Sequence, residues 1–127
     1  MAKFVHDTVM DTLLAFIADH GDTLFVLPSS QVVSFAAADA VDLAKHTMTE
    51  GISGADYAIT DNGNGRRLTI SQQVAIAVIA NGTATHIAIG DSVAETILLQ
   101  TTCPGVALTI GNTVTVNAFT HDVDEVT

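Results

Sequence analysis

The chain has 127 residues, enough for one domain with a single core. Apolar residues make up 48% of it and charged residues only 14%, well below the roughly 25% of an average soluble domain. Four Lys and Arg against fourteen Asp and Glu give a net charge of −10, so neither nucleic acid nor an anionic membrane surface is expected as a partner, because both attract clustered cations.

An N-terminal helix is predicted over residues about 4–20. Its apolar residues recur at helical spacing, and one stripe is expected to pack on the rest of the domain: Val5, Val9, Leu13, Phe16 and Ile17, with Met10 and Leu14 at the edge. A helix that docks a partner is the alternative. Gly21 follows the helix and is expected to end it in the left-handed conformation.

A buried strand is predicted for the apolar run TLFVL at residues 23–27, which Pro28 ends. Residues about 29–53 are predicted to form an extended loop, a long excursion that is often a contact arm in a small domain. A second strand at residues 31–37 and a short helix within the alanine-rich residues 36–46 are alternatives for parts of this loop.

The main core is predicted to come from a β-meander over residues about 55–119. Strands at 57–60 and 66–71 flank the turn-forming run DNGNG at 61–65. Asn81-Gly82 lies between two runs rich in Val, Ile and Thr and predicts a two-residue hairpin, in which Val78 pairs with Thr85. Both faces of this hairpin are expected to be covered, one by the core and one by another layer or subunit.

The last third of the chain is predicted to continue the meander. Cys103-Pro104-Gly105 predicts a turn after a strand at residues 95–101, and Gly111-Asn112 predicts a second hairpin between residues 106–110 and 113–119. Residues 120–127 are expected to form a frayed acidic tail. The sequence therefore predicts one mainly β (α+β) domain, an antiparallel β-sandwich or barrel-like meander with one N-terminal helix.

No catalytic, cofactor-binding or metal-binding residue is predicted. The five histidines make neither a helical HxxxH nor a strand-spaced HxH pair, and His86 is expected to pack in the interior or an interface. Cys103, the only cysteine, is expected to be a half-buried thiol rather than a nucleophile. The DNGNG run lacks the ligands of a calcium loop. Because nucleophile-elbow and phosphate-loop motifs are also missing, no enzyme is expected.

The N-terminal sequence MAKFVHDTVMD shows no basic segment followed by an apolar run, so no secretory signal is expected. No stretch approaches the roughly 18 apolar residues of a membrane span. The protein is therefore expected to be made in a reducing cytoplasm.

Five stretches carry a resemblance to a known group of proteins. They are MAKFVHDTVMDTLLAFI at 1–17, TLFVL at 23–27, GRRLTI at 65–70, GTATHIAI at 82–89 and ALTIGNTVTVNAF at 107–119. In these stretches the chain resembles small structural proteins of tailed bacteriophages. The resemblance covers most of the chain, but residues 29–53 match no pattern of that group.

The resemblance implies a virion component made in the host cytoplasm, most plausibly a capsid decoration or cement protein whose partner is the major capsid protein. A surface with so little charge favours association, so a homo-oligomer is expected, for instance a trimer on a local three-fold axis. A tail or neck subunit of the same particle is one alternative. A free β-sandwich ligand-binding module is the other.

Overall fold

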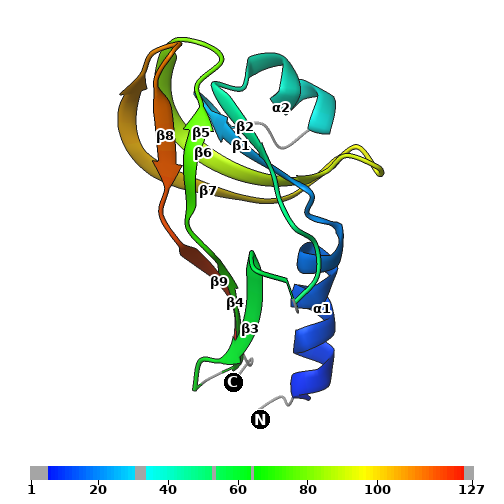
Figure 1. Ribbon diagram of the computed structural model, residues 1–127. Coiled ribbons are helices and arrows are strands. Elements are labelled where there is room, and N and C mark those ends of the chain that lie inside the picture. Colours follow the sequence, from blue (N-terminus) through cyan, green and yellow to red (C-terminus); the bar gives the residue numbers. More distant parts are fainter. Residues whose placement is uncertain (1–5, 31–33, 53, 64, 125–127) are drawn as a thin grey trace.

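The computed structural model describes residues 6–30, 34–52, 54–63 and 65–124, and it is mainly β (Figure 1). The elements in chain order are α1 (Asp7–His20), β1 (Thr23–Leu27), α2 (Phe35–Val41), β2 (Ala44–Thr47), β3 (Tyr57–Asp61), β4 (Gly65–Ile70), β5 (Gln73–Ala77), β6 (Gly82–Asp91), β7 (Thr96–Leu108), β8 (Thr113–Val116) and β9 (Phe119–Asp124). The predicted fold class is confirmed, although the strands do not close into a barrel.

Every strand pair is antiparallel, and the strands form three sheets. Their orders are β2-β1-β6-β7, β3-β4-β9 and β5-β8. A bridge between Ala44 and Val78 joins the first sheet to the third. Around the main core the strands therefore follow one another as β8-β5-β2-β1-β6-β7, and the two strands at the ends of this series, β7 and β8, do not pair with each other.

The predicted strand at residues 23–27 is confirmed as β1, and all five of its residues are buried. It pairs with β2 on one side and β6 on the other. Because side chains alternate along a strand, Leu24 and Val26 enter the main core, whereas Phe25 and Leu27 pack in a second core against Ala38 of α2. In Figure 1, α2 lies over the β1–β2 end of the molecule and α1 beside β3 and β4.

The predicted N-terminal helix is confirmed over residues 7–20, where His6 caps it by accepting a hydrogen bond from the Thr8 amide at 3.1 Å. The predicted left-handed ending is wrong, because Gly21 has φ −78°. Glycine is required there for space. A Cβ at this position would lie 2.6 Å from both the Tyr57 hydroxyl and Ile89 Cγ2.

The predicted packing stripe of α1 is also wrong. Met10, Leu14 and Ala18 are the buried residues, whereas the predicted stripe leaves three of its members more than half exposed: Val9 at 53%, Leu13 at 56% and Phe16 at 54%. Ile17 is partly buried, and Val5 lies outside the described residues. Apolar residues cover a wide arc of this helix, and the buried ones lie on the side on which Asp11 pairs with Arg66 of β4 at 2.7 Å.

Residues 29–53 do not form the extended loop that the sequence predicts. They contain α2, which begins after Ser34, whose hydroxyl accepts a hydrogen bond from the Ala37 amide at 3.1 Å. They also contain β2, which completes the sheet beside β1. The short helix considered for residues 36–46 is present up to Val41, and the alternative strand at 31–37 is wrong over residues 35–37 because helix replaces it. Residues 31–33 lie outside the described part.

The strands predicted at 57–60 and 66–71 are confirmed as β3 and β4, with Tyr57 opposite Ile70; residue 64 of the turn between them lies outside the described part. The hairpin at Asn81-Gly82 is wrong. β5 pairs with β8, and β6 pairs with β1 and β7. Gly82 does not take the positive φ that a type I′ turn requires. Long-range pairing therefore overrides the local turn signal.

The C-terminal hairpin and the tail are corrected in the same way. Cys103-Pro104-Gly105 lies within β7 rather than in a turn. The turn at 109–112 exists, with Gly111 at φ +95°, but it joins two strands that pair elsewhere. Residues 120–124 are part of β9, which pairs with β4, so this part of the predicted tail is ordered sheet. Residues 125–127 lie outside the described part.

Tyr57→Phe tests the contact that joins α1 to β3. The buried Tyr57 hydroxyl donates to the Gly21 carbonyl at 2.6 Å. Removing it leaves that carbonyl without this donor, so the variant should lose about 1–2 kcal/mol of unfolding free energy, measured by urea denaturation. Thr60→Val removes an exposed hydroxyl from the same strand and should change stability by less than about 0.5 kcal/mol. Equal effects of the two variants would contradict this role.

Asp42, at the end of α2, predicts a pH-dependent stability. It is buried, and its Oδ2 has no hydrogen-bond partner within the described residues. Burial, reinforced by the nearby Asp39 charge, raises the pKa of Asp42. The contribution of Asp42 to the unfolding free energy is therefore fully present below about pH 4, which is the pKa of an Asp in the unfolded chain. It is lost as the pH rises through the higher pKa of Asp42 in the folded chain.

The variant Asp42→Asn cannot ionise. Relative to the unmodified chain it should gain unfolding free energy between pH 4 and pH 7, measured by denaturation at both pH values. Asp19→Asn, on the exposed side of α1, controls for the change in net charge. A relative stability of Asp42→Asn that is the same at both pH values would refute this role for burial.

Candidate binding groove between two unpaired strand edges

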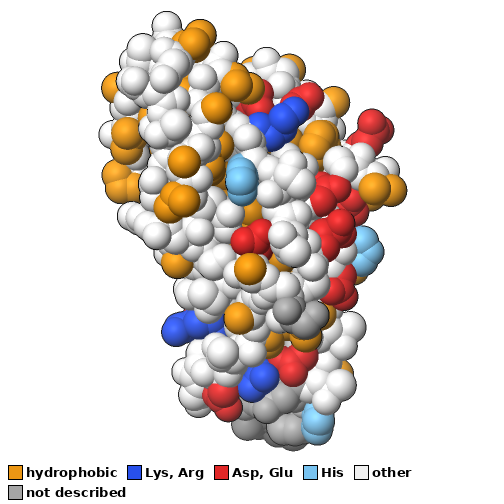
Figure 2. All heavy atoms as spheres, in the orientation of Figure 1, with side chains coloured by type: hydrophobic (Ala, Val, Ile, Leu, Met, Phe, Trp, Pro, Cys, Tyr) orange, Lys and Arg blue, Asp and Glu red, His pale blue; other side chains and the backbone are white. Residues whose placement is uncertain are grey.

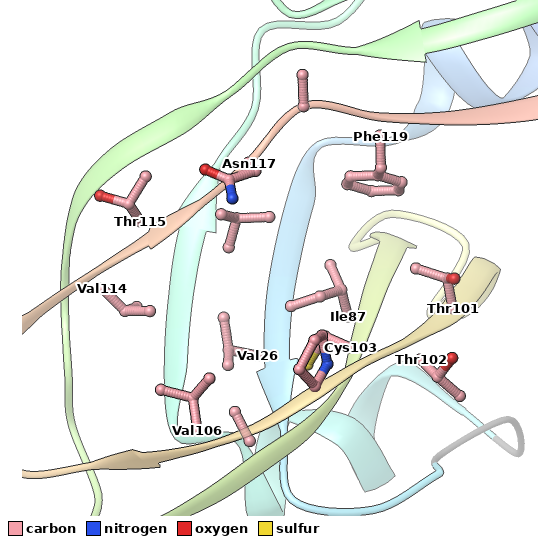
Figure 3. A pocket seen from close by; sticks show the side chains of 14 residues that line it. Val26, Ile87, Thr101, Thr102, Cys103, Val106, Val114, Thr115, Asn117 and Phe119 are labelled. Carbon is pink, nitrogen blue, oxygen red and sulfur yellow. The ribbon is translucent and has the colours of Figure 1, made fainter.

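The described residues enclose a groove of about 340 Å³ between β7 and β8. Figure 3 shows its side chains between the ribbons of these two strands, with Val26 and Ile87 behind them. β7 and β8 leave the turn at 109–112 and then diverge, because β7 pairs with β6 and β8 pairs with β5. The groove is therefore the gap at which the series of strands around the core fails to close.

A bulge in β7 shapes one wall of the groove. Ala84 of β6 lies opposite Val106 and His86 lies opposite Thr102, so three β7 residues face a single β6 residue between these pairs. Pro104 is one of the three and has no amide to donate to a ladder, which is why proline occurs in sheets at edges and bulges. On this wall, a molecule in the groove therefore meets side chains and a backbone edge whose hydrogen-bonding groups are interrupted at the bulge.

The floor of the groove is apolar and belongs to the main core. Val26, Ile87 and Val116 line it and are between 1% and 7% exposed. The rim carries Thr and Asn side chains together with Val106, which is 48% exposed. Such a surface can accept aliphatic groups, and its few polar groups are uncharged.

Cys103 is the one titratable residue among those that line the groove. It is partly buried, as expected from the sequence. Burial raises the pKa of its thiol, so the protonated form, which is a poor nucleophile, predominates at neutral pH. The groove therefore brings no acid–base pair or activated nucleophile of its own.

No Asp, Glu, Lys or Arg side chain lines the groove. Residues 68–90 and 96–121 contain no Asp, Glu, Lys or Arg. We name the part of these segments formed by β5, β8, the adjoining ends of β6 and β7, and the connections at 78–81 and 109–112 the uncharged lobe. Figure 2 shows it as a white and orange region at the upper left. Its exposed large aliphatic residues are Val74, Ile79, Val106 and Ile110.

Sequence reasoning missed this lobe although its signal is present in the chain. The low overall charge does not locate the lobe, whereas the distribution of the charged residues along the chain does. Between Arg67 and Asp122 only Asp91 and Glu95 are charged, and they flank the short connection from β6 to β7. A charge count along the chain would have marked the lobe. The groove itself could not be found in this way because it depends on strand pairing.

The charged residues concentrate at other parts of the molecule, where several hold elements together. Arg66 pairs with Asp11 of α1, and Arg67 donates two hydrogen bonds to Asp122 of β9 at 2.8 and 3.0 Å. A second hollow of about 330 Å³ lies beside the first of these pairs, between α1 and β4. Its polar groups already interact with each other, so it offers a weaker site than the groove.

The remaining candidates from the sequence do not assemble into a site. His86 is partly buried on β6, and its Nδ1 lies 2.8 Å from the Thr85 hydroxyl. Asp61 accepts a hydrogen bond from the Gly63 amide at 2.6 Å, as in a tight turn. No group of three His, Cys, Asp or Glu residues close enough to hold a metal ion occurs within the described ranges.

Comparisons with protein-family models, with curated proteins and with solved structures found no match to this chain. Neither described helix is long and apolar enough to cross a membrane. The groove, the uncharged lobe and the exposed face of α1 are apolar surfaces that the structure leaves accessible.

Cys103 provides a chemical test of the groove. Its thiol should react with Ellman's reagent more slowly than free cysteine at pH 7, because burial limits both access and ionisation. The rate should keep rising as the pH passes about 8.5, the ordinary thiol value. A reaction at pH 7 as fast as that of free cysteine would contradict a half-buried, protonated thiol.

Proposed function

We propose that this chain is a non-enzymatic structural protein of a phage virion, and that it decorates the capsid by packing apolar surfaces against the major capsid protein. The observation that carries the proposal is that two separate apolar surfaces are exposed. One is the uncharged lobe with its groove, and the other is the outward face of α1. A subunit that binds both its own copies and a shell needs two such surfaces.

The outward face of α1 has the form of a docking helix. Val9, Leu13 and Phe16 follow one another at intervals of four and three residues and form an exposed stripe beside the face that buries Met10 and Leu14. Phe16 also stacks on His20, with ring centroids 4.3 Å apart. Amphipathic helices that enter a partner's groove use anchors at this spacing. We assign this face, the α1 stripe, to contact with the capsid.

A tail or neck subunit would use the same two surfaces in another part of the particle. A free ligand-binding module is a further candidate, because a groove of about 340 Å³ lies within the usual range of small-molecule sites, about 300–1,000 Å³. The absence of a charged group from the groove lining favours an aliphatic occupant over a polar ligand. It also supports a structural role over catalysis.

Co-sedimentation with expanded phage capsids that lack the protein tests the proposal. Binding should saturate at a fixed ratio to the major capsid protein, and isolated tails should not bind. Leu13→Glu should weaken capsid binding at least about tenfold, because it places a charge within the α1 stripe. Val93→Glu adds the same charge at a residue that is 90% exposed beyond this stripe and should bind normally.

Three results would count against the capsid assignment. Binding to tails alone would identify a tail or neck subunit. Binding to neither particle by a monomeric protein would favour the free module. Equal capsid binding by Leu13→Glu and the unmodified chain would remove the α1 stripe from the contact.

A further inference from the structure

We infer that the uncharged lobe is the surface through which copies of this chain associate, with a second copy covering the groove and the Val106 side chain at its rim. The inference concerns the isolated protein and holds whichever particle the protein joins. It rests on the distribution of charge, on the chemistry of the groove and on the interrupted edge of β7.

Charge favours a second copy at this place. Each chain carries a net charge of −10, so two copies repel each other wherever their carboxylates approach within about 8 Å, the screening distance at physiological salt. Residues 68–90 and 96–121 contribute no carboxylate. The uncharged lobe is therefore a surface on which two copies can meet without bringing their carboxylates close together.

The α1 stripe is a poorer surface for self-association. Asp19, on the last turn of α1, is exposed. Two α1 stripes packed together would bring this carboxylate near its counterpart in the other copy. The apolar residues of the two surfaces are comparable in exposure, so the difference in charge decides between them.

The groove and its rim are suited to side-chain packing between copies. Val106 is an exposed aliphatic side chain beside an apolar groove. Each copy therefore presents both an apolar group that association would bury and an apolar surface against which the same group of another copy can pack. If the Val106 side chain of each copy packs against the groove of the other, the contact is reciprocal and closes into a symmetric dimer. Pro104 and the bulge interrupt the β7 edge, which favours side-chain contact over the addition of a strand.

Sedimentation velocity of the purified protein at physiological salt, over a range of concentrations, tests the inference. The unmodified chain should form a discrete oligomer that persists at high salt, because no charge is required for it. Val106→Glu should raise the dissociation constant at least about tenfold. Val93→Glu carries the same added charge on the connection between Asp91 and Glu95 and should associate like the unmodified chain.

Two further variants make the result specific. Val106→Thr keeps the shape of the side chain and suits a strand, but it replaces a methyl group by a hydroxyl and should also weaken association. If its circular dichroism spectrum is unchanged, misfolding is excluded as the cause. Leu13→Glu should not alter association. The reaction of Cys103 with Ellman's reagent gives an independent readout, since a second copy over the groove should slow it as the protein concentration rises.

The inference would be overturned by a monomer at every concentration. It would also be overturned by an oligomer that Leu13→Glu dissociates and Val106→Glu does not. Neither result depends on capsid binding, so failure here is distinguishable from failure of the proposed function.

Discussion

The burial of β1 on both of its faces is the constraint on which the rest of the structure depends. The five residues of this strand supply side chains to two cores, the main one through Leu24 and Val26 and the smaller one through Phe25 and Leu27. A strand buried on both faces needs a layer on each side. β2 and β6 therefore flank it, α2 covers one face, and β5 and β8 help to cover the other.

This arrangement leaves the strand series open at one place. β8 is held by β5 and β7 by β6, and nothing in the described chain lies between β7 and β8 except the side chains of the groove. The floor of the groove is thus a part of the main core that remains accessible from outside. Its location in the uncharged lobe, away from the ion pairs of Arg66 and Arg67, separates an exposed apolar surface from the charged parts of the molecule.

Turns predicted from local sequence are absent where the same residues pair with distant parts of the chain. Asn81-Gly82 has the composition of a tight hairpin, yet Asn81 instead accepts a hydrogen bond from the Ile110 amide at 2.8 Å, and the Val78 and Ile79 amides bond to Asn112 and Leu43. Cys103-Pro104-Gly105 has the composition of a turn, yet a bulge within a long edge strand accommodates it. Propensity describes what a segment can do alone, and tertiary pairing decides among the options.

The sequence by itself determined the mainly β class, the helix at residues 7–20, the buried strand at 23–27 and the turn-connected strands at 57–70, because each has a strong periodic or turn signal within a few residues. It also determined the segregation of charge, which a linear count reveals. Only the tertiary structure decided which face of α1 is buried, which strands pair and where the groove lies. Those features depend on contacts such as Asp11 with Arg66 and Gln73 with Val116, whose partners lie more than forty residues apart. Periodicity within a segment indicates that a face is apolar, but the partner that covers the face is set by packing across the whole chain.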